Sequence, residues 1–515
     1  MQPTISCLSN GIRVVSLHDK NYVNDVRSIG IYFDVPQSNP DSLAPCHVLN
    51  QALSQGSSHL GAFPGTLSVQ YSRDLISYRA TFPREEKPDH ALQLMANLWR
   101  RASSLTKSDT DAAAPFVSSR IEALRSDPQE VLNDLVHMRM FEGTALGLPL
   151  LHTRLEAGRC AELVPRDLDA LLATPLAGQD RKWHAPPLKQ LSNFVSSTHC
   201  PTRCVVVASG IPHDSLLQAT KRHLTFATER IPSGSSGDRP CEKPGKFGAI
   251  HGHYISMPPD CFLDVDICYP TKGLADPHLV PLLLAEDAIG KASAFSAGGP
   301  GKGVLTRANM RSMGMPGVMR ARAHMTTYGK QGFFGIHVGG DPAAARVFAS
   351  VSAAEFMSGA LEGFSDIEIR RAKSRLKASF SLAHEQQPYR MEDAARQVFA
   401  RNLRGSGMET PKGASGSSGF LTVRGLADLI DRCPTQSVGQ AMKELTCRCR
   451  PIVAWSHPES AFRFPEKGTS TPAPQFIVPI SADGRTLTKA LPTFASIDRA
   501  LGMIGAISKG QPQSK

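Results

Sequence analysis

Alternating apolar and polar residues predict short β-strands near the start of the chain, and helical patterns follow them. Residues 12–15 and 28–35 have the strand pattern, and the turn signal Asn10-Gly11 precedes the first of them. Residues 45–55 carry apolar side chains three and four positions apart, which predicts a helix. Residues 68–80 then alternate as a strand, and an amphipathic helical pattern follows. The pattern indicates a fold of mixed helices and strands.

The same order of patterns begins again after residue 247. Residues 254–257 and 264–269 have the strand pattern, and residues 277–289 predict a helix in the place that residues 45–55 hold earlier. Ser365 and Glu368 have the spacing of a capping box that opens a long helix. Because the shared order returns at an offset of about 250 residues, the sequence predicts two duplicated halves.

The boundaries between these halves follow from length and composition. A chain of 515 residues is too long for a single core. Residues 230–247 are rich in proline, glycine and serine and form the best candidate linker. We therefore predict an N-terminal domain at 1–229, a linker at 230–247, a C-terminal domain at 248–464 and a tail at 465–515.

Composition narrows the classes of partner. With 41% hydrophobic and 20% charged residues, the chain is typical of globular proteins. The 57 lysines and arginines exceed the 46 acidic residues but form no basic run, so no nucleic-acid partner is predicted. No uncharged stretch reaches the roughly 18 residues of a membrane span, so no transmembrane segment is predicted and membrane association would require partners.

The cysteines and the N-terminus bear on the compartment. Eleven cysteines occur without the paired spacing of a zinc site, which predicts reduced thiols in the cytosol or in the mitochondrial matrix. The first residues lack the arginine-rich and serine-rich pattern of a transit peptide. Either an import signal is absent from this numbering or it is of another kind.

A glycine-dense segment at mid-chain is the main candidate for binding. It consists of Phe295, Ser296, Ala297, Gly298, Gly299, Pro300, Gly301, Lys302 and Gly303. Its glycines permit close approach to another chain. It is not a phosphate-binding P-loop, because no serine or threonine follows Lys302. A solvated linker is the alternative, but the segment is short, carries Phe295 and lies between two helical patterns, which favours a contact loop.

Residues 295–303, with Val304, Thr306 and Arg307 after them, resemble the glycine-rich loop of alpha-type subunits in the pitrilysin-like (M16) metallopeptidase family. That family has further glycines before the phenylalanine, where this chain has residues 291–294 without glycine. The resemblance extends over about residues 3–458. It implies an α+β fold of two homologous M16 halves, each of two α/β modules with antiparallel sheets covered by helices.

The resemblance also places a zinc motif on the helix at residues 45–55. Active members carry His-x-x-Glu-His, in which two histidines on one helix face bind zinc and the glutamate activates water. Here His47 matches the first ligand, whereas Asn50 replaces the glutamate and Gln51 replaces the second histidine. Because an amide cannot accept the proton of water, we predict no catalytic residue, metal or cofactor in this chain. Glu130, which precedes Val131 and Asp134, lies where the family has a further carboxylate ligand. One histidine and one carboxylate far apart in the sequence do not make a zinc site, so we predict structural roles for His47 and this carboxylate.

Two functions follow from the resemblance. The first is a non-catalytic subunit that binds basic mitochondrial presequences and presents them to a zinc-bearing beta-type M16 subunit in a heterodimer. The candidate acidic contacts for such peptides are Glu286, Asp287, Glu392 and Asp393. The second is a structural core subunit of the cytochrome bc1 complex (complex III) of the respiratory chain, beside its other subunits. Both imply the matrix side of the mitochondrial inner membrane, and an independently active peptidase is excluded by Asn50 and Gln51.

Overall fold

The computed structural model describes most of both predicted halves. The described residues are 3–18, 25–35, 43–57, 63–150, 186–224, 248–254, 262–274, 276–291, 307–308, 317–341, 345–403, 419–448, 451–458, 462–463, 475–478 and 487–489. The predicted linker at 230–247, the glycine-rich segment at 295–303 and most of the tail lie outside them. The domain boundaries therefore stay a prediction.

The first half is built on a mixed six-stranded sheet with the order β1-β2-β6-β3-β5-β4. Its strands are β1 (Thr4–Cys7), β2 (Arg13–Leu17), β3 (Val26–Asp34), β4 (Thr66–Tyr71), β5 (Leu75–Pro83) and β6 (Cys204–Ser209). Only the neighbours β2 and β6 run parallel within it. The strand expected at 68–80 is two strands, because the chain turns where Ser72 bonds to Asp74 and to the backbone of Leu75.

The second half repeats this topology in a five-stranded sheet with the order β7-β11-β8-β10-β9. Its strands are β7 (Gly248–Tyr254), β8 (Leu263–Lys272), β9 (Val318–Thr327), β10 (Gln331–Gly340) and β11 (Ile452–Pro458). Again only the first two neighbours in the order, β7 and β11, run parallel. The matching order and direction of β2-β6-β3-β5-β4 confirm the prediction of two duplicated halves.

Helices cover one face of each sheet and form its main hydrophobic core. On the first sheet these are α1 (Leu43–Ser57), α2 (Pro88–Ser103), α3 (Lys107–Arg125), α7 (Leu188–Thr198) and α8 (His213–His223). On the second they are α9 (Leu279–Ile289), α11 (Ala345–Leu361), α12 (Asp366–Glu385), α14 (Val423–Arg432) and α15 (Thr435–Arg448). The predicted capping box is present at the start of α12, where Ser365 and Glu368 bond to each other's backbone. The α+β class with helix-covered antiparallel sheets is confirmed.

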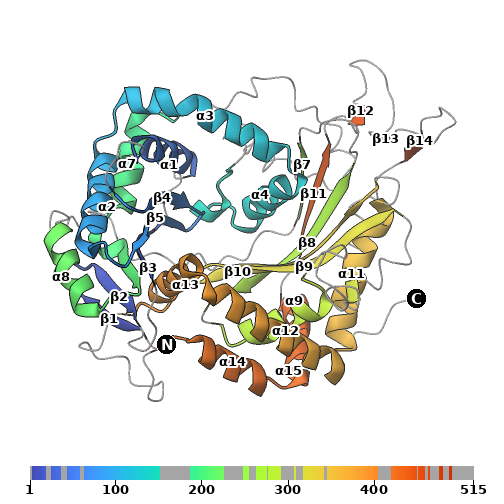
Figure 1. Cartoon of the computed structure of the whole chain (residues 1–515). Coiled ribbons are helices and arrows are strands. Elements are labelled where there is room, and N and C mark those ends of the chain that lie inside the picture. The colour runs from blue at the N-terminus through green and yellow to red at the C-terminus, as the bar shows by residue number, and fades with distance from the viewer. Residues whose placement is uncertain are drawn as a thin grey trace.

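The other face of each sheet is covered by a helix from the opposite half. Helix α4 (Pro128–Met140) packs on the second sheet, against residues such as Cys268 and Phe333, and lies beside β7 and β11 in Figure 1. Helix α13 (Gln387–Ala400) packs in the same way on β3 and β6 of the first sheet. Within the described residues, the second face of the large sheet of each half is therefore closed by this exchange of helices.

Two smaller features complete the fold. Short strands β12 (Phe462–Arg463), β13 (Gln475–Val478) and β14 (Leu487–Lys489) form a three-stranded sheet at the start of the predicted tail. Among the described helices, none combines the length and the apolar character that crossing a bilayer requires.

Three buried histidines are each hydrogen-bonded to a tyrosine hydroxyl. His137 of α4 contacts Tyr328 at 2.6 Å, His199 contacts Tyr78 at 2.5 Å, and His47 contacts Tyr71. Burial lowers the pKa of His137 to about 3, and the positive charges of Arg73 and His324 act in the same direction. The hydrogen bond to the Asn133 backbone and the charge of Asp134 act in the opposite direction, but burial prevails. Burial likewise lowers the pKa of His199 to about 3 and that of His47 to about 4. These side chains are neutral in the folded chain.

Acidification is therefore expected to destabilise the fold well above the pH at which the buried histidines titrate. Below about pH 6.5 the unfolded chain protonates these imidazoles while the folded chain does not, so stability falls with pH in that window. Between about pH 6.5 and pH 5 each such histidine contributes a loss of up to about 2 kcal/mol. Urea unfolding at a series of pH values measures this loss. It is expected to be smaller in His137→Gln, and an identical pH dependence in the variant would contradict the assignment.

Candidate functional site

The glycine-rich segment lies outside the described residues, but the structure describes residues before and after it in the chain. Before it, α9 ends at Gly290, whose φ of 135° favours glycine and whose carbonyl oxygen accepts from Ala323 N at 2.7 Å. After it, the guanidinium of Arg307 donates to both carboxylate oxygens of Glu368 at 2.6 and 2.8 Å. Gly290 and Arg307, the described residues on either side of the segment, are therefore each bonded to β9 or α12 of the second half.

Arg307 makes further contacts that hold it in place. It donates to the carbonyl oxygen of Gly363 at 2.8 Å and to Ser358 Oγ at 3.1 Å, and it lies 4.3 Å from the ring centroid of Phe364. Hydrogen bonds from Arg307 lower the pKa of Glu368 to about 2, so the ion pair remains charged at any physiological pH. A planar, charged fork of this kind fixes both direction and distance.

The residues in the positions of the zinc motif lie together on α1. His47 is 4% exposed, and its Nδ1 is hydrogen-bonded to Tyr71 of β4. His47 Nε2 and Asn50 Oδ1 are buried without a hydrogen-bond partner. Burial lowers the pKa of His47 to about 4, so the imidazole is neutral. Gln51 is partly exposed on the same helix.

The neighbouring carboxylate is bound to a cation of the chain itself. Asp134 of α4 is 1% exposed, forms an ion pair with Arg73 and accepts from Leu150 N at 2.9 Å. Arg73 also donates to the carbonyl oxygens of Leu146 and Leu148 at 2.9 and 2.6 Å. Glu130, one turn earlier, is exposed. Asp134 therefore forms a buried ion pair that links α4 to the turn between β4 and β5.

These residues do not fit a zinc ion. A catalytic zinc site needs three protein ligands and an open position for water. The site offers one imidazole and two amides, its buried carboxylate is paired with a guanidinium, and that guanidinium would repel a metal cation. A water polarised at this position would also find no carboxylate base at residue 50.

The proposed acidic contacts for presequences are engaged within the chain. Glu286 is 2% exposed and bonds to Met325 N and Lys291, and Asp287 bonds to Arg375 at 2.8 Å. Their assignment as peptide contacts is wrong, because both side chains are buried between α9 and its neighbours β9 and α12. The other two lie on α13, where Glu392 pairs with Arg396 at 3.0 Å and Asp393 with His384 at 3.1 Å.

The second sheet carries a row of ionisable residues and glycines on the face toward α4, here called the polar face; its ionisable residues are buried on β8 and β10 and partly exposed on β9. Sequence analysis did not identify it, although alternation of ionisable residues within the predicted strand at 264–269 could have indicated it. Its members are Asp264, Asp266 and Cys268 of β8, Arg320, Arg322 and His324 of β9, and Gly335, His337 and Gly339 of β10. Helix α4 reaches it through Gln129, which accepts from Arg322 at 2.8 Å.

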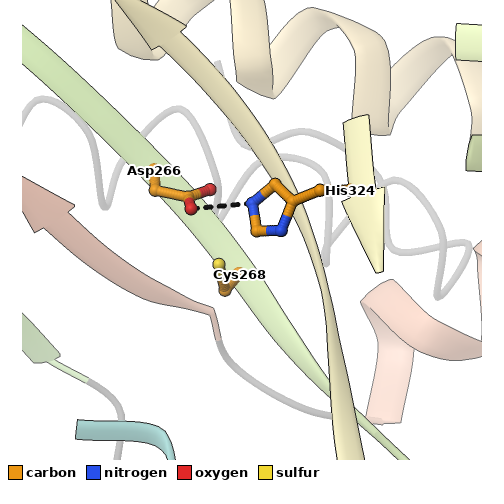
Figure 2. A group of neighbouring side chains, drawn as sticks. All are labelled: Asp266, Cys268 and His324. Atoms are coloured by element: carbon orange, nitrogen blue, oxygen red, sulfur yellow. Dashed lines mark hydrogen bonds and ion pairs between the residues drawn. The ribbon is translucent and has the colours of Figure 1, made fainter. Parts of the chain in front are cut away.

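Two carboxylates organise the polar face. Asp264 is fully buried and accepts from His337 at 2.8 Å and from Arg320 at 2.7 and 2.8 Å. Asp266 bonds to His324 at 2.7 Å, as Figure 2 shows. Burial opposes ionisation of both, but these neighbours prevail and lower the pKa of each carboxyl. The face is therefore charged and internally paired.

Comparison with known proteins agrees with the resemblance found in the sequence. Residues 51–154 match the family model described as Insulinase (Peptidase family M16). The chain is 24% identical to the mitochondrial-processing peptidase subunit alpha of Bos taurus, over 66% of this chain and 61% of that protein. It is 23% identical to that of Solanum tuberosum, over 77% and 73%, and 23% to that of Neurospora crassa, over 76% and 77%. The alignments with the mammalian relatives thus span less than two thirds of those proteins.

The fold has a counterpart among solved structures. A chain of the structure titled "Complex III2 from Candida albicans, Inz-5 bound" superposes with a TM-score of 0.68, covering 88% of this chain and 95% of that one at 16% identity. This likeness concerns the fold. Together with the family model and the relatives, it confirms the similarity to M16 proteins that the sequence predicted.

Proposed function

As a relative of the M16 peptidases and of mitochondrial processing peptidase alpha subunits, this chain is, we propose, a non-catalytic alpha-type subunit that binds mitochondrial presequences. The observation that carries the proposal is the altered zinc motif beside an Asp134–Arg73 ion pair. A zinc-bearing beta-type M16 subunit would then supply the metal and the catalytic glutamate. The two chains would act as a heterodimer on the matrix side of the inner membrane.

The residues of the altered zinc motif do not have the chemistry that peptide hydrolysis requires. Hydrolysis of a peptide by a zinc enzyme needs a metal-bound water and a base to take its proton. Asn50 cannot serve as that base, and Gln51 is a poor replacement for an imidazole ligand. A neutral, buried His47 alone does not hold zinc.

Substrate binding is proposed for the glycine-rich segment, residues 295–303. Its amides and Phe295 would contact an amphipathic presequence helix, while Gly290 before it is bonded to β9 and Arg307 after it to α12. Because glycine permits many backbone conformations, the segment could adapt to presequences of different sequence. Lys302 is part of the segment. Replacing it with alanine tests whether its side chain contacts the peptide, in which case cleavage falls, or only keeps the segment soluble, in which case cleavage is unchanged.

A structural core subunit of complex III is the second candidate, favoured by the similarity in fold to a chain of that assembly. The two roles are compatible, because a core subunit that keeps a presequence-binding segment could process presequences within the respiratory complex. Native gel electrophoresis of mitochondrial membranes separates the cases. Migration of the chain with cytochrome b would establish the structural role, whether or not processing activity migrates with it.

Reconstitution tests the main proposal. The purified chain, a purified beta-type M16 subunit and their mixture are incubated with a basic presequence peptide. Cleavage is expected only in the mixture and is expected to stop when a zinc chelator is added. Chelator-sensitive cleavage by this chain alone would overturn the assignment as non-catalytic. If the beta-type subunit alone cleaved the peptide as fast as the mixture, the proposed role of this chain in presequence binding would be wrong.

A further inference from the structure

Three potential metal ligands converge on the polar face, far from the altered zinc motif. Asp266 and Cys268 lie two positions apart on β8, and His324 faces them from β9 (Figure 2). Their ligand atoms, a carboxylate oxygen, the Sγ and an imidazole nitrogen, all lie within 4.8 Å of one another. Two of the three residues are almost fully buried, with Asp266 4% exposed and Cys268 0%.

The convergence depends on a glycine in the strand between them. Strand β10 separates β8 from β9, and its Gly335 pairs with Cys268 on one side and with His324 on the other. Strands two places apart are about 10 Å from each other, so their side chains meet only where the middle strand has none. A Cβ atom at Gly335 would lie 2.4 Å from His324 Nε2 and 2.6 Å from Cys268 Sγ. Glycine therefore keeps the space between these two donors open.

One buried oxygen at this place has only a thiol for a partner. Asp266 Oδ2 is hydrogen-bonded to His324, whereas Asp266 Oδ1 is buried without a nitrogen or oxygen partner and the Cys268 thiol is the neighbour that interacts with this carboxylate. Leaving a buried carboxylate oxygen unsatisfied is costly, and an ion is one way to satisfy it. A purely structural Asp266–His324 pair satisfies one oxygen of the carboxylate, leaves the other with a thiol, which is only a weak donor, and gives no reason for the open space beside it.

We propose that Asp266, Cys268 and His324 bind a zinc ion. A thiolate, an imidazole and a carboxylate are the ligands that zinc prefers, and donors bound to one zinc at about 2.0–2.3 Å lie within about 4 Å of each other. To reach that spacing, the donors, which lie within 4.8 Å of one another, would move closer together and the Asp266–His324 hydrogen bond would be released. His324 is 26% exposed at its side chain, so the ion enters from that side.

Binding would have two consequences for this half. The thiol of Cys268 releases its proton when it becomes a ligand, so the two negative charges of Asp266 and the thiolate balance the ion. The ion would also link β8 to β9 across β10, on the sheet face that α4 covers. It would thereby stabilise the sheet on which this helix from the first half packs. This site is independent of the proposed peptide-binding role.

Cobalt is the probe for the test, because its bonds to thiolates absorb in the near ultraviolet. The purified full-length chain is expected to bind one equivalent of cobalt with a sulfur-to-cobalt band, and zinc is expected to displace it. The band is expected to disappear in Cys268→Ser and to persist in the control Cys7→Ser, whose thiol is exposed on β1. Persistence of the band in Cys268→Ser, or its absence from the unaltered chain, would overturn the proposal.

Gly335→Ala provides a second variant that keeps all three ligands. Its added methyl group would fill the space between His324 and Cys268, so cobalt affinity is expected to fall at least about tenfold, the loss typical even for perturbed supporting residues. Zinc is expected to raise the melting temperature of the unaltered chain and of Cys7→Ser but not of Gly335→Ala or Cys268→Ser. An equal rise in all four proteins would show that zinc binds elsewhere.

Discussion

Replacing residues 295–303 with a serine-rich linker of the same length is expected to abolish presequence cleavage by the reconstituted heterodimer while leaving its assembly intact. The linker preserves the chain connection between α9 and Arg307 but removes Phe295 and the glycines of the segment. Loss of substrate positioning alone lowers catalytic efficiency by about 100-fold or more. The measurement is kcat/KM for a presequence peptide, with size-exclusion chromatography to confirm the heterodimer.

Variants at Arg307 test whether the position of the glycine-rich segment matters, separately from the contacts that the segment itself makes with the peptide. Arg307→Ala removes the forked contact with Glu368 and the contact with the carbonyl oxygen of Gly363. Arg307→Lys keeps the charge but cannot make the fork. We expect an intermediate loss of kcat/KM in both, larger for alanine. If cleavage is unchanged when the whole segment is replaced, the role in peptide binding is wrong, whatever the effect of Arg307.

Much of the fold could be predicted from the sequence because local patterns and the fold agree. The repeated order of strand and helix patterns identified the two halves, and the spacing of Ser365 and Glu368 identified the start of α12 through bonds made within one turn. The altered motif at His47, Asn50 and Gln51 could be found because the residue types themselves carry the chemistry. None of these inferences requires knowledge of distant contacts.

Features that depend on distant partners could not be predicted in this way. The exchange of α4 and α13 between the halves is decided by which sheet face each helix covers, and a helix's own sequence does not say which sheet that is. Glu286 and Asp287 resemble surface carboxylates in the sequence, but β9 and Arg375 bury and pair them. The polar face likewise arises from three strands drawn from separate parts of the second half.

Loss of the guanidinium of Arg73 is expected to cause the largest loss of stability in this chain. The turn between β4 and β5 binds both exchanged helices, since Arg73 pairs with Asp134 of α4 and Asp74 pairs with Arg396 of α13. Arg73 and Asp134 are both buried, so Arg73→Met leaves a carboxylate without its cation in a site of low polarity. Such a change typically costs about 3–5 kcal/mol. Urea unfolding at neutral pH measures the difference in the free energy of unfolding.

Two controls accompany this prediction: a double variant that removes both buried charges, and a variant that breaks an exposed ion pair. Arg73→Met combined with Asp134→Leu removes both charges, and because a buried ion pair contributes little over apolar residues of similar size, most of the lost stability is expected to return. Lys377→Met breaks an ion pair with Asp431 whose side chains are 34% and 55% exposed, and it is expected to cost less than about 1 kcal/mol. If Arg73→Met costs no more than Lys377→Met, the turn does not hold α4 and α13 in place. In that case the apolar contacts of α4 with Cys268 and Phe333, and of α13 with β3 and β6, would be sufficient to keep the halves together.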